Sequence, residues 1–186
     1  MNKNIGETYI TSDSHFGHKN IIKYCNRPFS SVEEMDETMI ENWNAKVKPN
    51  DTIYHLGDFS FSKNPQQYFK RLNGRKILIR GNHDGLAIVD LGWDGVHHYY
   101  ELKVGKQLIV LFHYGMRVWN GSHHGSWHLY GHSHGKLPSS GLSFDAGVDC
   151  HNFSPISYDE VKIKMESLKN NEENMKQSPD YELLSE

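Results

Sequence analysis

Blocks of apolar residues in the first half of the chain predict three strands that alternate with helices. The strands are expected over residues 7–12, 51–56 and 75–79, and the helices over 18–24, 32–47 and 64–72. The second helix follows Ser30 and Ser31, either of which can cap it. Its stripe of Met35, Met39 and Trp43 recurs at helical spacing and is typical of a core-facing surface. Strands that alternate with helices indicate a parallel sheet with right-handed crossovers.

The second half of the chain has a different pattern, which favours a mostly antiparallel arrangement. Strands are expected over 97–104 and 107–112, joined by a tight turn at Gly105 and Lys106, and further strands over 127–130 and 142–148. A closing helix is predicted over 158–168, and a polar, acidic tail over 169–186. The length allows one sizeable core, so we expect residues 1–168 to form a single domain.

Composition narrows the classes of function. The net charge of −3 gives no overall basic footprint for nucleic acid, although a local basic groove stays open. Cys25 and Cys150 form neither a disulfide framework nor a CxxC pair. The N-terminus lacks a signal-peptide core, and no apolar run approaches the length of a membrane span. We therefore expect a cytoplasmic protein without a membrane partner, and nothing in the sequence specifies an oligomeric state.

Histidine is the unusual component, with 13 residues in the chain. It is the commonest metal ligand and the usual proton carrier near neutral pH. Its positions, together with those of aspartate and asparagine, follow a pattern, because five strand-like runs each end in such residues. These are Asp13 and His15, then Asp58, then Asn82, His83 and Asp84, then His113, and finally His132 and His134.

These side chains are expected to share one site, because the carboxyl ends of parallel strands converge on one edge of an α/β sheet. Carboxylates, an amide oxygen and imidazoles form a mixed ligand set that suits a pair of divalent transition metals such as Mn, Fe or Zn. The spacings Asp-x-His and His-x-His place both side chains on one face if the local backbone is extended. Each motif alone is common; the five in order favour a metal site.

The series D-x-H, GD, GNHD, a lone histidine after a strand and GHSH resembles the calcineurin-like metallophosphoesterase superfamily, over nearly the whole chain. The resemblance implies an α/β fold, a four-layer α/β/β/α sandwich with two divalent transition metal ions (Mn, Fe, Zn or Ni) at the strand ends. Protein Ser/Thr phosphatases carry GDxxDRG and GNHE, whereas this chain has GDFSFSK, with Phe61 at the aspartate position, and GNHD. It looks more like the small bacterial and phage phosphoesterases.

The resemblance also implies a role for each motif residue. It places the first metal on Asp13, His15, Asp58 and His134, and the second on Asp58 as a bridge with Asn82, His113 and His132. His83 would face the substrate as the general acid, and Asp84 would orient its ring.

A metal-dependent phosphoesterase is therefore expected, which hydrolyses a phosphomonoester or phosphodiester by a metal-bridging hydroxide. A small nucleotide-type substrate is favoured, because the chain carries no basic stripe and no added domain. The alternative within this class is a nuclease that acts on DNA or RNA, with a steep salt dependence. A non-catalytic metal-binding scaffold is disfavoured because every motif position is filled. A structural zinc site is disfavoured because the cysteines lie outside the motifs.

Arg27 and Arg80 are candidates for binding substrate phosphate, because a guanidinium group matches phosphate oxygens. The alternative for each is a surface salt bridge, and Arg117 is a weaker candidate of the same kind. His18 either lies over the site or faces solvent.

The remaining histidines and two tryptophans are interpreted by their surroundings. We expect a hydrogen-bonded core residue at His55, a strand-lining residue at His128, surface residues at His123 and His124, and packing on the sheet by Trp119 and Trp127. His97, His98 and His151 receive no assignment.

Overall fold

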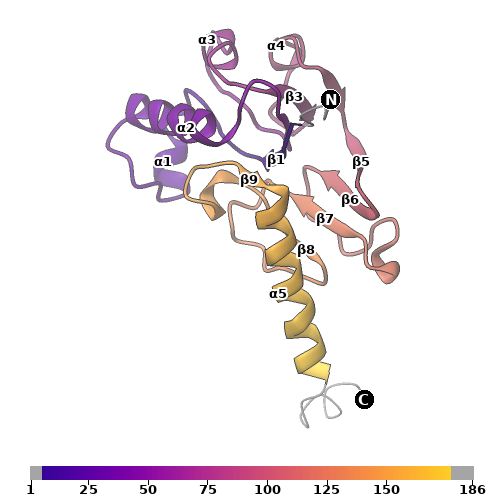
Figure 1. The fold of residues 1–186 in the computed structure, drawn as a ribbon. Helices are drawn as coiled ribbons and strands as arrows, with labels where there is room; N and C mark the ends of the chain where they lie inside the picture. The colour runs from indigo at the N-terminus through magenta and orange to yellow at the C-terminus, as the bar shows by residue number, and fades with distance from the viewer. Residues whose placement is uncertain (1–5, 177–186) are drawn as a thin grey trace.

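The computed structural model describes residues 6–176 and contains two β-sheets that pack face to face (Figure 1). The first sheet has the strand order β4-β3-β2-β1-β9, formed by β1 Thr8–Thr11, β2 Thr52–His55, β3 Arg75–Ile79, β4 Gly95–His97 and β9 Ile156–Ser157. The second has the order β5-β6-β7-β8, formed by β5 Tyr99–Val104, β6 Gln107–Phe112, β7 Trp127–Tyr130 and β8 Ser143–Asp145. The expected α/β class with two stacked sheets is confirmed.

The first sheet is parallel through β1, β2, β3 and β4, as the alternation of strands and helices predicts. Its outer face is covered by helices, of which α2 Val32–Lys46 is the longest (Figure 1). The side-chain hydroxyl of Ser31 accepts from the Glu34 N–H and caps this helix. The predicted stripe of Met35, Met39 and Trp43 is buried in the core under the sheet, so this prediction is confirmed.

The second sheet corrects the expectation of a mostly antiparallel half. Only β5 and β6 pair antiparallel, across the predicted tight turn, whereas β6 pairs with β7 and β7 with β8 in parallel. The connections over 113–126 and 131–142 are long enough to return the chain to the starting edge, which a parallel pair requires.

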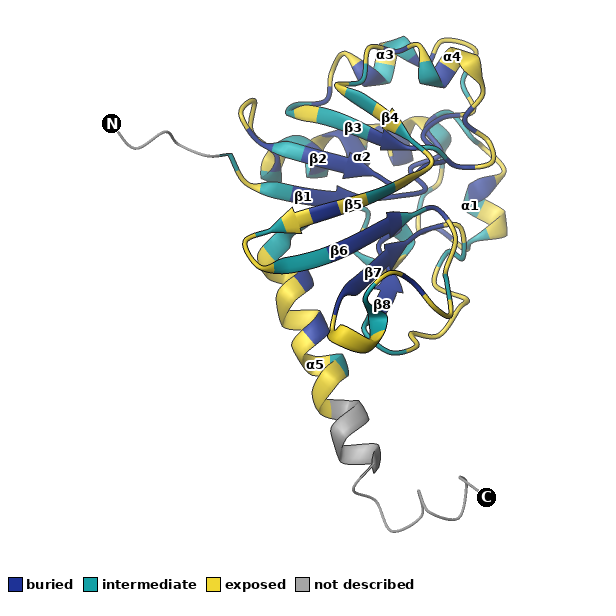
Figure 2. Ribbon diagram, turned by 90° about the vertical axis from the view of Figure 1, so that its right-hand side faces the viewer, coloured by how far each residue is buried: buried dark blue, intermediate teal, exposed yellow. Residues whose placement is uncertain are grey.

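The core between the two sheets contains residues from the strands that lead to the predicted site. Ile10, Leu56 and Ile79 of the first sheet pack with residues of the second, among them Leu111 and Leu129. The strands β1, β2 and β7 are mainly buried, whereas α5 Tyr158–Lys176 is largely exposed in its described part (Figure 2). Each strand that leads to a predicted ligand is therefore anchored in this core.

Several short elements carry no periodic signal and were not predicted. They are α4 Leu86–Val89, β4, β9 and the 3-10 turns η1 Ser122–His124 and η2 Val148–Cys150. The helices predicted over 18–24 and 64–72 are present but shorter, as α1 Ile21–Tyr24 and α3 Gln66–Phe69. The predicted end of the last helix at 168 is too early, because α5 continues to Lys176. The rest of the predicted tail, 177–186, lies outside the described residues. Within 6–176, no helix is both long and apolar enough to span a membrane.

Candidate metal centre

The loops that follow β1 and β2 are held together by main-chain hydrogen bonds at the carboxyl end of the first sheet. The Asp13 N–H donates to the Gly57 carbonyl over 2.9 Å, and the His15 N–H donates to the Asp58 carbonyl over 3.0 Å. The side chain of Asp13 reaches the loop after β7, where its Oδ2 accepts from the His132 N–H over 2.8 Å. Loops from both sheets therefore meet at one point, as the sequence predicts.

A first group of ligand atoms belongs to Asp13, His15 and His134, and these atoms all lie within 4.8 Å of one another. Asp13 Oδ1 and His15 Nε2 are 3.8 Å apart, and each is buried without a hydrogen-bond partner among the described residues. An unpartnered buried polar atom is costly, and a cation between the two would satisfy both. The donor atoms therefore fit a metal ion.

A second group belongs to Asp58, His113 and His132, with ligand atoms again within 4.8 Å of one another. His113 Nδ1 lies 2.7 Å from the Leu56 carbonyl, so a neutral ring donates there and keeps its Nε2 lone pair free. That Nε2 lies 3.0 Å from Asn82 Oδ1 and 3.6 Å from Asp58 Oδ2. Three acceptor atoms that converge in this way fit a second cation.

Asp58 lies between the two groups. Its Oδ2 is 3.7 Å from His15 Nε2 in the first group and 3.6 Å from His113 Nε2 in the second. Its Oδ1 accepts from the His83 N–H over 2.9 Å, which fixes the orientation of the carboxylate. This geometry agrees with a bridging position between two ions.

At Asp13 and His15, burial and the charges of neighbouring groups shift the side-chain pKa in opposite directions. Burial raises the pKa of Asp13, but its interactions with His15, His113 and His134 outweigh burial and hold the pKa well below the usual range. Burial lowers the pKa of His15 despite its carboxylate neighbours. An ionised aspartate beside a neutral imidazole is the protonation state that binds metal.

The backbone conformation of the ligand loops differs from the expected extended one. Residues with left-handed φ include most of the predicted ligands, namely Asp13, His15, Asp58, His132 and His134, with φ between 48° and 66°. The explanation of Asp-x-His and His-x-His by strand alternation is therefore wrong. The chain instead turns sharply at each ligand and directs its side chain into the loop cluster.

His83 belongs to neither group of ligand atoms. Its side chain is 48% exposed, and its Nε2 lies 4.0 Å from Asp58 Oδ2. It is thus beside the candidate metal centre and open to a ligand from solvent.

Asp84 is placed differently from the expectation that it orients the His83 ring. Its buried carboxylate accepts from three main-chain donors, the N–H groups of Asp58, Gly81 and Phe59, at 2.8, 2.8 and 3.0 Å. Burial raises its pKa, and these hydrogen bonds oppose that rise. Asp84 therefore fixes the Asp58 loop against the Asn82 loop, because its oxygens are engaged by the backbone.

Arg27 does not face a substrate position, which corrects the prediction for this residue. Its buried guanidinium donates to the carbonyls of Asp13 and Ser14 and forms a bidentate ion pair with Asp149. Asp149 Oδ2 also lies 2.7 Å from His134 Nδ1. Burial raises the pKa of Asp149, but the bonds from His134 and Arg27 outweigh it and lower the pKa. No motif in the sequence indicated Asp149.

His18 lies over the site, one of the two alternatives considered for it. Its Nδ1 is 3.3 Å from His15 Nδ1, and burial together with His15 and Arg27 lowers its pKa to about 4. Its ring stacks on Phe61 at 4.1 Å. Arg80 donates from Nε to the Asp84 carbonyl over 2.6 Å, and a role for it in substrate binding stays a prediction.

The other predictions for histidine and tryptophan are confirmed. His55 is fully buried, with Nε2 2.8 Å from Ser14 Oγ, and His128 is buried in β7. His123 and His124 are exposed, while Trp119 and Trp127 are buried.

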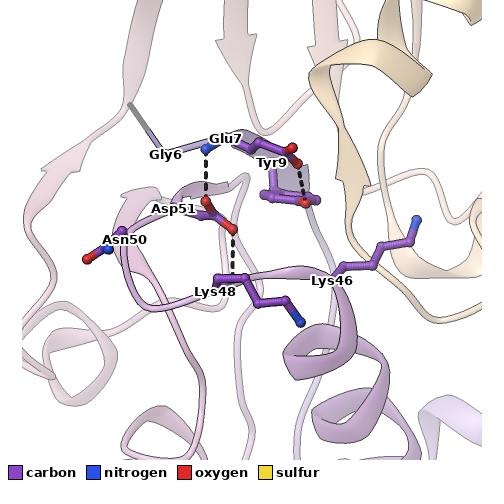
Figure 3. Close-up of a pocket in the computed structure, with 7 residues that line it drawn as sticks. All are labelled: Gly6, Glu7, Tyr9, Lys46, Lys48, Asn50 and Asp51. Carbon is purple, nitrogen blue, oxygen red and sulfur yellow. Dashed lines mark hydrogen bonds between the residues drawn. The ribbon is translucent and has the colours of Figure 1, made fainter. Parts of the chain in front are cut away.

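A separate hollow lies at the opposite end of the first sheet, beside the amino ends of β1 and β2 (Figure 3). Its polar groups are paired internally: Asp51 accepts from the N–H groups of Glu7 and Lys48, and Tyr9 donates to Glu7. Lys46 is engaged by Glu160. The converging acceptors are therefore found at the carboxyl end and not in this hollow.

Comparisons with known proteins show the family to which the chain belongs. The family model of calcineurin-like phosphoesterases matches residues 7–186. The uncharacterized protein MJ1445 of Methanocaldococcus jannaschii is 35% identical over 162 residues, which cover 81% of this chain and 86% of that protein. The Gene 66 protein of Mycobacterium phage L5 is 38% identical over 86 residues, which cover 44% of this chain and 41% of that protein.

A solved structure extends the likeness to the fold. The protein of unknown function AQ665 from Aquifex aeolicus matches with a TM-score of 0.70 at 26% identity, over 85% of this chain and 98% of that chain. The strand order, the ligand groups and the family match all agree with the resemblance of the sequence motifs. The chain belongs to the calcineurin-like phosphoesterase family.

Proposed function

We propose that the protein hydrolyses phosphoesters at the candidate metal centre, with His83 as the general acid. The observation that carries the proposal is the position of Asp58 Oδ2, within 3.7 Å of a ligand nitrogen from each group. An exposed imidazole that belongs to neither group lies beside it. This arrangement combines two candidate cation positions that share a carboxylate with a separate proton donor, and both features promote phosphoester hydrolysis.

The chain's own residues would hold two divalent transition metal ions. The first would be bound by Asp13, His15, Asp58 and His134, and the second by Asp58, Asn82, His113 and His132. Paired divalent ions neutralise a phosphate and lower the pKa of a bound water. The mixed oxygen and nitrogen donors suit Mn, Fe, Zn or Ni.

His83 would give a proton to the leaving oxygen of the ester. Its main-chain N–H is held by Asp58 Oδ1, while its ring stays half-exposed and can reach a bound ester. General acid catalysis of this kind contributes about 10²–10⁴-fold to a rate. His18 lies over the site and would contact the bound phosphoester. A small nucleotide-type phosphoester is the proposed substrate, because the net charge of −3 offers little attraction to long nucleic acid.

The test is a reconstitution of metal-depleted protein with Mn²⁺, Fe²⁺, Zn²⁺ or Ni²⁺, followed by assay on 4-nitrophenyl phosphate and bis(4-nitrophenyl) phosphate. We expect two ions per chain and hydrolysis that requires them. Asp58→Asn should lower both bound metal and turnover, whereas the exposed control His124→Ala should change neither. Metal binding without hydrolysis of either ester would contradict the proposal.

A further inference from the structure

Two exposed aromatic rings flank the candidate metal centre, one beside each group of ligand atoms. Phe61 and Tyr114 are each 40% exposed. Phe61 contacts the ring of His15 in the first group, and Tyr114 contacts the rings of His113 and His132 in the second. Large apolar rings that stay exposed on both sides of a polar site suggest a ligand that covers them.

Among the described residues, no aromatic ring stacks on one of the two faces of Phe61. His18 and His15 both lie nearly parallel to it, with ring centroids at 4.1 and 5.1 Å. Rings stacked on opposite faces would be separated by two layers of about 3.5 Å, roughly 7 Å in all, but their centroids are 5.4 Å apart, so both lie on one face. His83 is inclined at 52° to Phe61 with centroids 4.8 Å apart, so it does not stack on the other face.

Tyr114 presents its ring in a different manner. Its plane stands at 73° to the His113 ring, with centroids 4.9 Å apart, and at 67° to the His132 ring, with centroids 4.8 Å apart. With a third T-shaped contact from the Phe112 ring at 5.6 Å, these edge contacts fix the Tyr114 ring beside the second group, where it stays 40% exposed. The ring is thus held by two ligand histidines, next to the position where a phosphate would lie.

Two nearby phenylalanines show that exposure is specific to Phe61, namely Phe59 on the same loop and Phe16 on the segment paired with it. Phe16 and Phe59 are 1% and 0% exposed and pack in the core under the first sheet. Phe61 follows Ser60 on the same loop, but its ring is directed to the histidines. Burial in the core therefore does not account for Phe61.

We propose that Phe61 and Tyr114 bind the planar groups of a small phosphodiester, so that the substrate carries nucleobases on either side of the scissile phosphate. A diester presents one organic group on each side of its phosphorus, and the two rings lie on the two sides of the centre. Stacking of a base on an aromatic side chain is tolerant of sequence because every base has a π-face. The inference rests on the proposed function, since it assumes that the phosphate is bound between the two ligand groups.

The test compares two chromogenic diesters with the same leaving group, thymidine 5′-(4-nitrophenyl phosphate) and methyl 4-nitrophenyl phosphate. The native protein should prefer the thymidine ester in kcat/KM by roughly 5- to 150-fold, the range that stacking of one base provides. Phe61→Leu and Tyr114→Leu keep apolar bulk but lose the flat face, and at least one should reduce this preference severalfold. The control Ile163→Ala, an exposed apolar residue of α5, should keep it.

The outcomes separate the two proposals. Equal kcat/KM for both esters in the native protein, or equal losses on both esters in each leucine variant, would overturn the aromatic platform and leave phosphoester hydrolysis intact. Affinity is also measured by calorimetry with the dinucleoside thymidylyl-thymidine on metal-loaded protein. Binding that weakens in a leucine variant supports the platform even if no ester is hydrolysed, in which case only the proposed function fails.

Discussion

Replacement of Arg27 by methionine should destabilise the folded protein far more than a change at a surface arginine. The Arg27 side chain is fully buried, and its guanidinium donates to Asp149 and to the carbonyls of Asp13 and Ser14 at 2.8 to 3.1 Å. Methionine retains much of the apolar stem but none of the donors. The change therefore isolates the contribution of the buried charge and its hydrogen bonds.

The expected magnitude comes from what the substitution leaves behind. Asp149 keeps only its contact with His134 among its two side-chain partners, and two main-chain carbonyls lose a donor. Removal of one partner from a buried ion pair costs about 3–5 kcal/mol. Since the total free energy of unfolding is typically 5–15 kcal/mol, a loss of this size approaches the whole stability of a marginal domain.

The assay is urea denaturation of metal-depleted protein, in which unfolding is monitored by tryptophan fluorescence. Arg75→Met is the matched control, because Arg75 is 64% exposed and its Nε lies 3.6 Å from Asp94, so its loss should cost less than about 1 kcal/mol. The double variant Arg27→Met with Asp149→Leu should recover part of the lost stability, because no unpaired charge stays buried. If Arg27→Met costs no more than Arg75→Met and instead raises KM, Arg27 binds substrate and its buried role is refuted.

Three further changes test other parts of the site. On an ester with an alkoxide leaving group, whose departure needs a proton, His83→Ala should lower turnover by about 10²–10⁴-fold with unchanged metal content, measured by steady-state kinetics and elemental analysis; a loss of metal would show that His83 is a ligand. Gly131→Ala should impair folding or metal binding, because the added Cβ would overlap Ser12 Oγ and Asp13 Oδ2; a fully stable, metal-replete variant in thermal unfolding would contradict this contact. Burial lowers the pKa of His55 from 6.5 to about 3 in the folded protein. Between these two pH values, His55 therefore binds a proton in the unfolded chain but not in the folded one. Stability should therefore fall as the pH decreases from 6.5 towards 3, by up to about 1.4 kcal/mol per pH unit for this group, and His55→Gln should show a shallower slope in urea titrations; an identical slope would exclude this contribution.

The sequence was sufficient to predict which side chains meet at the candidate metal centre, because local order determines where strands end. Asp13, Asp58 and Asn82 each follow an apolar run that becomes a parallel strand, and parallel strands bring their carboxyl ends to one edge. The pairing within the second half could not be predicted in this way. Connection length and hydrophobicity allow either direction for β7, and the observed parallel pairing with β6 depends on how the intervening loop packs.

The roles of Arg27 and Asp149 could not be predicted, because they depend on contacts between distant segments. The two residues are 122 positions apart in the chain and meet only after the first strand and η2 are in place. A loop arginine near a phosphate site suggests a phosphate ligand on chemical grounds alone. Its burial is a property of the tertiary structure, and burial is what removes it from the substrate.

Arg27 and Asp84, whose predicted roles differ from those in the structure, share one structural role that explains the geometry of the centre. A left-handed φ at a non-glycine residue costs of the order of 1–3 kcal/mol and persists only when its surroundings impose it. Asp13 and Asp58 both have such a conformation. Arg27 holds the carbonyl of Asp13, and Asp84 holds the N–H of Asp58. Two buried charged side chains that do not face the site thus fix the backbone of two candidate ligands, so the fold itself sets the positions of Asp13 and Asp58.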